Sequence, residues 1–360
     1  MSASQFKDVR VVNNVRVEGV ACSMPENISE VSDLAEKFGE ENIQKIMAST
    51  GVFRRHVVDS ECSSDLCVAA AERLIADLAV DRASIDTLIF VSQTHDHTLP
   101  ATACILQERL KLSLGVAAFD VALGCSGYVY GLWLASSLIS GGGSRRVLLL
   151  VGDTISKIVS EEDRSVAALF GDAGSATLLQ YDESAQPISF ALGTDGRGAN
   201  NLIVPAGGFR DRTGAFSDNS EPEVRGPFDL FMNGAEIFAF TLARVPALVR
   251  ALHESRQDSG EGIDHYVFHQ ANKFMLEHLA KRMKLPREKV LLDLESVGNT
   301  SCTSIPLALS LAELEKDNRV TGLMMLAGFG VGYSWAGCII NFDNVWVSPM
   351  TYTRDLKEPV

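Results

Sequence analysis

Cys125, His269 and Asn299 are the residues of this 360-residue sequence whose types suit nucleophilic catalysis. Cys125 lies in the segment 119–128 (FDVALGCSGY), where we expect a buried strand to end and a helix of small and apolar residues to begin. Backbone N–H groups and the positive end of a helix dipole stabilise a thiolate, so we expect the pKa of Cys125 to fall from about 8.5 toward neutrality. Taken alone, Cys125 has an equally simple interpretation, because cysteine is often buried as a small apolar group.

His269 and Asn299 supply N–H groups that can stabilise negative charge on an oxygen. His269 begins the segment 269–272 (HQAN) after an apolar strand, and Asn299 lies in 298–306 (GNTSCTSIP), a polar turn that leads into a helix. The ends of strands are where α/β folds build their sites. Each residue alone has a structural alternative, since a histidine can be buried in a core and an asparagine before a helix caps it well.

Two other patterns are weaker. His95 and His97, two residues apart on a loop, are poor evidence for a metal site. The glycines of 328–332 (GFGVG) do not have the GxGxxG spacing that opens a helix in dinucleotide sites. We predict neither a metal nor a cofactor. The cysteines are odd in number and lack CxxC pairs, so we expect mostly reduced thiols at positions 22, 62, 67, 104, 125, 302 and 338.

Apolar runs of strand length alternate with longer helical patterns along the chain. Continuous apolar strands are buried on both faces and are typical of layered α/β folds. Helices are expected over 64–78 and 127–139, the second ended by three glycines. The predicted strands are 87–91, 146–151, 176–180, 265–268, 322–326 and 336–342.

One strand pattern occurs twice in the sequence. Residues 174–182 (GSATLLQYD) and 333–343 (YSWAGCIINFD) have similar patterns about 160 residues apart. The repeat predicts two similarly folded halves, 1–185 and 186–360, with a site formed between them. Residues 207–223, rich in Gly, Asp, Ser and Arg, are predicted to form a long surface loop.

Composition excludes several classes of protein. A net charge of −14 argues against nucleic acid as a partner, because phosphate binding needs a basic face. No apolar run reaches the roughly 18 to 20 residues of a membrane span, and residues 1–14 lack the hydrophobic stretch of a secretory signal. We therefore expect a globular cytoplasmic protein without a membrane interaction.

Four further motifs accompany the three segments and occur in a fixed order. They are STGVFRRH at 49–56, LPATAC at 99–104, FGDAGSA at 170–176 and GFGVGYSW at 328–335. Together they resemble the thiolase superfamily, and within it the β-ketoacyl-acyl-carrier-protein synthase III enzymes, over nearly the whole chain. The resemblance implies an α/β, thiolase-like fold of two duplicated halves in an αβαβα arrangement, with Cys125, His269 and Asn299 as the catalytic set.

The resemblance also implies a mechanism. An acyl thioester loads Cys125, a malonyl-type extender loses carbon dioxide, and the resulting enolate attacks the acyl-enzyme in a Claisen condensation. His269 and Asn299 would stabilise the enolate oxygen, while the backbone N–H groups of Cys125 and Val331 would form the oxyanion hole. The substrates would be thioesters of CoA or of acyl-carrier protein. The substrate pocket would contain Leu99, Phe329, Met232 and Gly234.

The chain differs from the family at the positions that bind the adenine nucleotide of CoA. Enzymes that prime with acetyl-CoA carry a Trp and an Arg just ahead of the Thr-Gly motif, and these positions are Lys45 and Ser49 here; only Arg164 matches a second Arg. A lysine cannot reproduce a flat platform for adenine, so a carrier-protein-bound acyl donor is favoured over acyl-CoA. Acyl-carrier proteins are acidic, and the candidate docking residues, at spacings that can share one helix face, are Lys273, Lys281 and Arg282.

Two departures concern the acyl pocket. Leu99 stands where many acetyl-specific relatives place a Phe supplied by the partner subunit, which predicts acyl chains longer than acetyl and a homodimer. Val331 replaces a usual glycine beside the oxyanion hole; its N–H is retained, but its β-branched side chain is expected to reshape the pocket.

Three alternatives share this fold. A non-decarboxylating acyltransferase would pass the acyl group from Cys125 to an alcohol, amine or sugar, and Asn299 argues against it because such an enzyme needs no second enolate donor. A hydroxymethylglutaryl-CoA synthase is disfavoured by Gln93, which lies where those enzymes place a catalytic Glu. A silent partner subunit would commonly have lost the nucleophile, whereas Cys125 is present.

Overall fold

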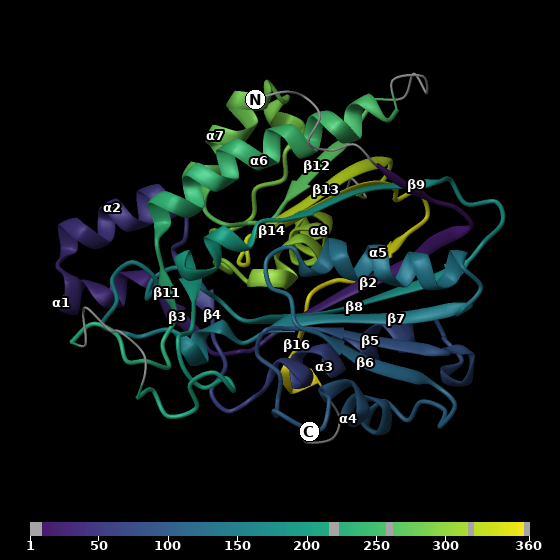
Figure 1. Cartoon of the computed structure of the whole chain (residues 1–360), viewed down its shortest axis with the longest axis horizontal. Helices are drawn as coiled ribbons and strands as arrows, with labels where there is room; N and C mark the ends of the chain where they lie inside the picture. Colours follow the sequence, from purple (N-terminus) through teal and green to yellow (C-terminus); the bar gives the residue numbers. More distant parts are fainter. Residues whose placement is uncertain (1–8, 216–222, 257–261, 316–319, 356–360) are drawn as a thin grey trace.

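Five layers of alternating helices and sheets make up the fold (Figure 1). The computed structural model describes residues 9–215, 223–256, 262–315 and 320–355. Two sheets lie roughly one above the other, with two helices between them and further helices on each outer face. The αβαβα arrangement expected from the sequence is therefore confirmed.

The larger sheet is built mainly from the first half of the chain. Its central strands are continuous apolar segments; β5 (TLIFV) is buried at all five positions. The strands β5, β6 and β7 run parallel to one another, while β8 is antiparallel to both of its neighbours. In spatial order they are β15 (Trp346–Val347), β2 (Val15–Met24), β8 (Ala173–Tyr181), β7 (Arg146–Asp153), β5 (Thr87–Val91) and β6 (Ala117–Val121), with β16 (Thr351–Tyr352) also paired to β2.

The smaller sheet repeats this plan in the second half. Its β12 and β13 are parallel and β14 is antiparallel to β13, just as β5, β7 and β8 are arranged in the larger sheet. The predicted repeat therefore corresponds to β8 and β14, the equivalent strands of the two sheets. In spatial order the strands are β1 (Arg10–Val12), β9 (Ile188–Thr194), β14 (Ser334–Asn341), β13 (Leu323–Gly330) and β12 (His265–Phe268).

Two short hairpin-like pairs lie outside the main sheets. One joins β3 (Ile28–Glu30) to β4 (Arg54–His56), and the other joins β10 (Leu202–Ile203) to β11 (Phe231–Met232). Both pairs are antiparallel. In Figure 1 they lie together below α2 and the start of α6.

Helices cover both sheets. The central helices α5 (Gly127–Ser140) and α8 (Ser304–Glu315) contact both sheets, and α5 is apolar nearly all round because neither of its main faces meets water. Within α5, Gly131 allows Leu149 and Val91 of the sheet to pack within 3.2 Å of where a Cβ would stand. The outer helices are α3 (Ser63–Asp77) and α4 (Thr102–Arg109) on the larger sheet, α6 (Gly234–Glu254) and α7 (Lys273–Met283) on the smaller side, and α1 (Ala35–Phe38) and α2 (Glu40–Thr50) at one end.

The structure differs from the sequence expectations in two places. The strand before Cys125, β6, is not a buried strand: it forms the edge of the larger sheet, with Ala117 exposed and the other four residues half-buried. The sheets divide the chain between β8 and β9, close to residue 185, but β1 joins the smaller sheet and β15 and β16 return to the larger one. The two halves therefore exchange their terminal segments.

Residues 207–215 and 223, the described part of the predicted loop, contain no helix or strand, and residues 216–222 lie outside the described residues. Among the described helices, none has the length and hydropathy needed to cross a bilayer.

Candidate active site

Cys125 lies where the two sheets approach each other. It follows the edge strand β6 and precedes α5, and the residue is only 7% exposed. The last residues of β13 press against it from the other half: a Cβ on Gly330 would stand 2.8 Å from its sulfur, and one on Gly328 would stand 2.6 Å from its carbonyl oxygen. Only glycine permits this approach, which brings the backbone N–H of Val331 into a hydrogen bond with the thiol sulfur.

Hydrogen bonds of two serines stabilise this contact between the halves. The Oγ atoms of Ser126 and Ser334 lie 2.6 Å apart, and Ser334 Oγ donates to the carbonyl of Val331 at 2.9 Å. The peptide groups on either side of the sulfur are thereby held together. The N–H groups of Cys125 and Val331 both reach the sulfur.

The expected low pKa of Cys125 is wrong for the free protein. Burial of the thiol raises its pKa to about 11, and the negative charge of Asp153 acts in the same direction. Hydrogen bonds from Val331, from its own N–H and from Ser301 lower the pKa but do not offset the loss of hydration. Cys125 is therefore a neutral thiol in the free protein near pH 7.

His269 follows β12 and is 2% exposed. Its backbone N–H continues the sheet by donating to Ala327 O at 2.8 Å, and its Nδ1 lies 2.7 Å from Ser304 Oγ. Ser304 Oγ also accepts the backbone N–H of Gln270 at 3.2 Å, so we assign the serine proton to Nδ1 and the imidazole proton to Nε2. Burial lowers the pKa of His269 to about 4, which makes it a neutral N–H donor near pH 7.

The side chain of Asn299 is fixed in orientation. Its Oδ1 accepts the backbone N–H of Ser301 at 2.9 Å, and its Nδ2 donates to Ala271 O at 3.3 Å. Because Oδ1 is committed as an acceptor, Nδ2 points to the opposite side, and its second proton is available to a ligand. Asn299 N also donates to Leu169 O, which ties this turn to the first half.

Ser301 is the residue of this site that the sequence did not single out. It is 2% exposed, has a positive φ of 52°, and contacts all three predicted catalytic residues. Its hydroxyl bonds the Cys125 sulfur, its backbone makes a hydrogen bond with His269, and its N–H bonds Asn299. Its position two residues after Asn299 in the GNTS turn was the available signal, but a serine in a turn is usually explained by the turn itself.

The predicted pocket residues occupy different environments. Phe329 is 1% exposed and meets the His269 ring edge-on at 5.8 Å, so it lies at the site. Met232 is half-buried and packs on the same apolar cluster as Phe329. Gly234 is exposed at the start of α6, and Leu99 is 78% exposed, so the structure does not bring either of them to Cys125 within one chain.

The predicted donor-binding residues lie at the surface near one end of the molecule. Lys45 Nζ pairs with Glu41 at 2.6 Å, and Ser49 Oγ donates to Ile46 O within the same helix, α2. Arg164 is exposed on the loop that precedes β8. The structure therefore leaves Arg164 accessible but commits the polar groups of Lys45 and Ser49 to their own helix.

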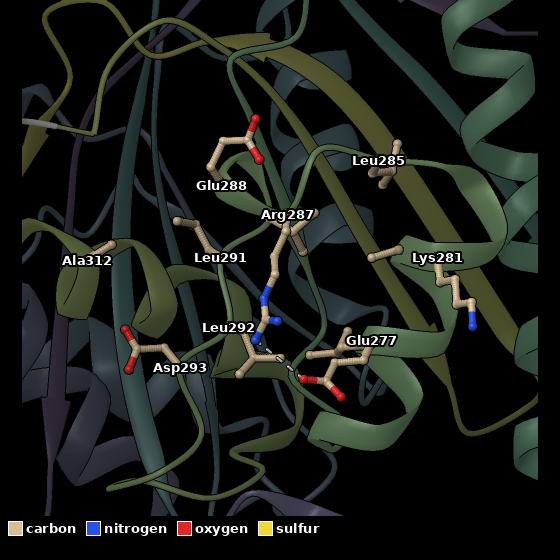
Figure 2. Close-up of a pocket in the computed structure, with 12 residues that line it drawn as sticks. Glu277, Lys281, Leu285, Arg287, Glu288, Leu291, Leu292, Asp293 and Ala312 are labelled. Atoms are coloured by element: carbon tan, nitrogen blue, oxygen red, sulfur yellow. Dashed lines mark ion pairs between the residues drawn. The ribbon is translucent and has the colours of Figure 1, made fainter.

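The three basic residues expected to share a face of α7 do not. Lys273 and Arg282 are nine residues apart, about two and a half helical turns, and so point to opposite sides. Lys273 packs against Gly51 at the end of α2. Lys281 lines a separate hollow of about 610 Å³ between α7, the segment 285–293 and α8, which contains none of the predicted catalytic residues (Figure 2). Glu277 and Arg287 form an ion pair of 3.7 Å there.

Gly330→Ala tests the contact between the halves. An added methyl group would stand 2.8 Å from both Cβ and Sγ of Cys125 and must displace the thiol from the Val331 N–H. We expect a loss of unfolding free energy of about 1–3 kcal/mol and slower alkylation of Cys125 by iodoacetamide. Gly196→Ala, whose methyl group would meet nothing within 4 Å, is the control. Equal behaviour of the two variants in denaturant unfolding and alkylation would contradict this packing.

The low pKa of His269 predicts a pH-dependent stability. Its folded-state pKa of about 4 lies below the unfolded value of 6.5, so the unfolded chain binds the proton first and stability falls as the pH drops through this range. We expect the contribution of His269 to fall by about 2 kcal/mol between pH 7 and pH 5. Urea unfolding should be measured for the native protein and for His269→Asn at both pH values. The difference between their free energies of unfolding gives the contribution of His269. An unchanged difference would mean that His269 is not buried in its neutral form.

Comparisons with known proteins agree with this geometry. The C-terminal model of 3-oxoacyl-[acyl-carrier-protein] synthase III matches residues 254–342, and the model named 3-oxoacyl-[acyl-carrier-protein] synthase III matches residues 119–196. A putative 3-oxoacyl-[acyl-carrier-protein] synthase 3 of Campylobacter jejuni is 32% identical, covering 95% of this chain and 98% of its own. A β-ketoacyl-[acyl-carrier-protein] synthase III of Caldanaerobacter subterraneus is 34% identical, over 90% and 97%.

Solved structures give the same result. A 3-oxoacyl-(acyl-carrier protein) synthase from Burkholderia xenovorans superposes with a TM-score of 0.90 at 40% identity, over 96% of this chain and 99% of that chain. OleA from Xanthomonas campestris, at 17% identity and a TM-score of 0.74 over 92% of this chain and 99% of that chain, shares the fold. The chain belongs to the β-ketoacyl-acyl-carrier-protein synthase III family of condensing enzymes.

Proposed function

We propose that the protein joins an acyl group, carried on Cys125, to a malonyl-type thioester by decarboxylative Claisen condensation. The observation that carries the proposal is the pair of oriented N–H donors around the thiol. The fixed amide of Asn299 retains a proton for a ligand, and neutral His269 supplies an N–H that meets the backbone of Ser301 at rest and can turn to a ligand. Both residues are bonded to Ser301, which also bonds the Cys125 sulfur. Two neutral donors suit an enolate oxygen, whose charge appears only during the reaction.

The first half-reaction transfers the acyl group. The Cys125 sulfur bonds to the thioester carbon, the carbon–sulfur bond of the donor breaks, and the thiol proton leaves with the donor thiolate. The oxyanion formed on the way meets the N–H groups of Cys125 and Val331, which already lie at the sulfur. Because the pKa of Cys125 is about 11 at rest, loss of its proton is part of this step's barrier.

The second half-reaction forms the carbon–carbon bond. The malonyl carboxylate leaves as carbon dioxide, and its bonding electrons pass into an enolate whose oxygen accepts N–H bonds from His269 and Asn299. The enolate carbon attacks the acyl carbon, the Cys125 thiolate departs, and it recovers a proton from the solvent. A histidine with a pKa of about 4 is a weak base, so its role here is donation of a hydrogen bond.

The alternative of acyl transfer to an alcohol, amine or sugar needs a base for the acceptor. Near the thiol, His269 is committed through Nδ1 to Ser304 and carries its proton on the other nitrogen in our assignment. That tautomer donates to an oxyanion and does not take a proton from an acceptor. Condensation is therefore the better match.

An acyl-carrier protein is the acyl donor that we propose over CoA. The helix α2, where relatives that use acetyl-CoA hold adenine, presents Glu40 and Glu41, and Lys45 is already paired with Glu41. Beside Arg164, Glu162 pairs with Lys37 of α1. Because Lys45 and Lys37 already pair with these carboxylates, neither cation is free to hold the phosphates of CoA. The basic residues Lys273 and Arg282, on opposite sides of α7, would make separate contacts with an acidic carrier rather than one patch.

A homodimer completes the proposal. The edge strand β6 leaves one row of backbone groups without a partner strand in the described chain, and Leu99 and Leu114 nearby are 78% and 93% exposed. Exposed edges and large apolar side chains of this kind are typically covered in an assembly. In a dimer Leu99 would reach the pocket of the other subunit, where its size would admit acyl chains longer than acetyl.

Cys125→Ala tests the acyl-enzyme. Without the sulfur no covalent acyl group can form, so intact-mass spectrometry should detect an acyl adduct on the native protein and none on the variant. The panel should contain acyl-carrier-protein and acyl-CoA donors from acetyl upward, followed by release of labelled carbon dioxide from a malonyl thioester. Acylation without carbon dioxide release would favour the non-decarboxylating acyltransferase, and acylation of the variant would refute both enzymatic functions.

A gain of function tests the choice of donor. The double variant Lys45→Trp with Ser49→Arg restores a flat ring and a cation on α2, so the KM for acyl-CoA should fall by about tenfold through stacking and phosphate contacts. The KM for the acyl-carrier protein should stay the same, which makes it the internal control. If the unaltered protein already uses both donors with equal kcat/KM, the proposed preference is wrong.

A further inference from the structure

A buried carboxylate that the condensation does not use lies behind Cys125. Asp153, the last residue of β7, is 0% exposed and has no basic side chain bonded to it among the described residues. It instead accepts hydrogen bonds from neutral groups on two neighbouring segments. These are Ser92 Oγ at 3.1 Å, Gln93 N at 2.7 Å, Gln93 Nε2 at 3.3 Å, Thr94 Oγ1 at 3.3 Å and Cys302 Sγ at 3.1 Å.

Gln93 connects this carboxylate to the active site. Its Nε2 donates to Asp153 Oδ2 and also to Ser301 Oγ, at 3.3 and 3.2 Å. The amide lies flat over Gly124, the residue before the nucleophile: a Cβ on Gly124 would stand 2.3 Å from Cδ and Nε2 of Gln93. The side chain therefore occupies one fixed place against the Cys125 turn.

The directions of these hydrogen bonds follow from the charge on Asp153. A carboxylate accepts only, so the amide must turn Nε2 toward it, because Oε1 in that place would be repelled. The second Nε2 proton then goes to Ser301 Oγ, which acts as the acceptor of that bond. The hydroxyl proton of Ser301 is left for its other partner, the Cys125 sulfur.

We propose that Gln93 is a positioning residue: anchored by Asp153, it orients the Ser301 hydroxyl as a hydrogen-bond donor to the Cys125 sulfur. The thiolate that leaves in each condensation then meets three donors, the two backbone N–H groups and this hydroxyl. The inference rests on the proposed acyl-enzyme function, since it assigns the group that stabilises the sulfur when its proton or acyl group departs.

The surrounding charged and titratable groups agree with an amide at position 93. Asp153 is the charge that faces the sulfur from β7 and raises its pKa, while the neutral His269 faces Ser301 from the end of β12. Cys302 is held as a neutral thiol because burial and Asp153 raise its pKa. A Glu at position 93 would add a second negative charge beside Asp153 and would accept the Ser301 proton, turning it away from the sulfur.

Alkylation of Cys125 by iodoacetamide measures this role without any substrate, since the thiolate is the reacting form. Rates should be taken from pH 7 to pH 10 by intact mass, with peptide mapping to assign Cys125. For the isosteric Gln93→Glu we expect about a tenfold lower rate and a profile moved to higher pH, and for the smaller, apolar Gln93→Leu about a threefold lower rate. Gln107→Glu makes the same change on α4, where the amide bonds Leu112 O and no other group of the described residues, and it should match the native protein.

Gly124→Ala displaces the Gln93 amide while residue 93 itself remains Gln. The new methyl group would overlap the end of the Gln93 side chain, which can move, so the variant should fold and react like Gln93→Leu. Native alkylation rates in both Gln93→Leu and Gly124→Ala would overturn the inference. A slow reaction confined to Gln93→Glu would also overturn it, because the added charge alone would then explain the effect.

The proposed function can fail separately. If the native protein releases no carbon dioxide from malonyl thioesters but the alkylation profiles shift as described, condensation is wrong and the positioning role of Gln93 stands. If the native protein condenses its substrates and the alkylation profiles of the variants do not shift, the condensation stands and Gln93 has no role in positioning Ser301.

Discussion

The contact between the backbone of β13 and the Cys125 turn is the constraint on which the site depends. Two sheets with helices between them would ordinarily be separated by side chains, yet Gly328 and Gly330 allow main chain to meet main chain. This approach places a donor from the second half, the N–H of Val331, on a nucleophile from the first. A duplicated fold thereby gains a site that neither half contains alone.

Burial of Cys125, His269 and Asn299 then determines which hydrogen-bond partners they need. The predicted catalytic side chains are between 2% and 7% exposed, so each of their hydrogen-bonding groups needs a protein partner or a ligand. Ser301 provides partners for all three of these residues. Its hydroxyl bonds the Cys125 sulfur, its N–H bonds Asn299, and another group of its backbone bonds His269. Its positive φ lets adjacent polar groups of one residue point toward three neighbours.

Much of this fold was predictable from local pattern. Strands that are apolar at nearly every position, such as β5, are typical of layered α/β folds, and the similarity of β8 and β14 reveals the duplication. The position of Cys125, His269 and Asn299 at strand ends indicated their convergence. The edge position of β6 was not predictable, because an apolar strand covered by a neighbouring strand and one left at an edge have the same sequence pattern.

The pKa of Cys125 was harder to predict from the sequence than the identity of the residues around it. The junction of a strand and a helix suggested an acidic thiol, but the loss of hydration at a fully enclosed sulfur outweighs the neighbouring donors. Ser301 and Asp153 were missed because their roles depend on hydrogen bonds between segments far apart in the sequence, such as the bond from Gln93 to Ser301.

The resting state of the site has a consequence for catalysis. Cys125 and His269 are both neutral near pH 7, because burial raises the pKa of the thiol and lowers that of the imidazole. Donors aimed at an uncharged site do little in the ground state, and their electrostatic gain appears when an oxyanion, an enolate or a departing thiolate forms. The charge of Asp153 opposes an anion on the Cys125 sulfur. The neutral amide of Gln93 lies between that charge and Ser301, so it presents protons to the reacting side and leaves the negative charge behind it.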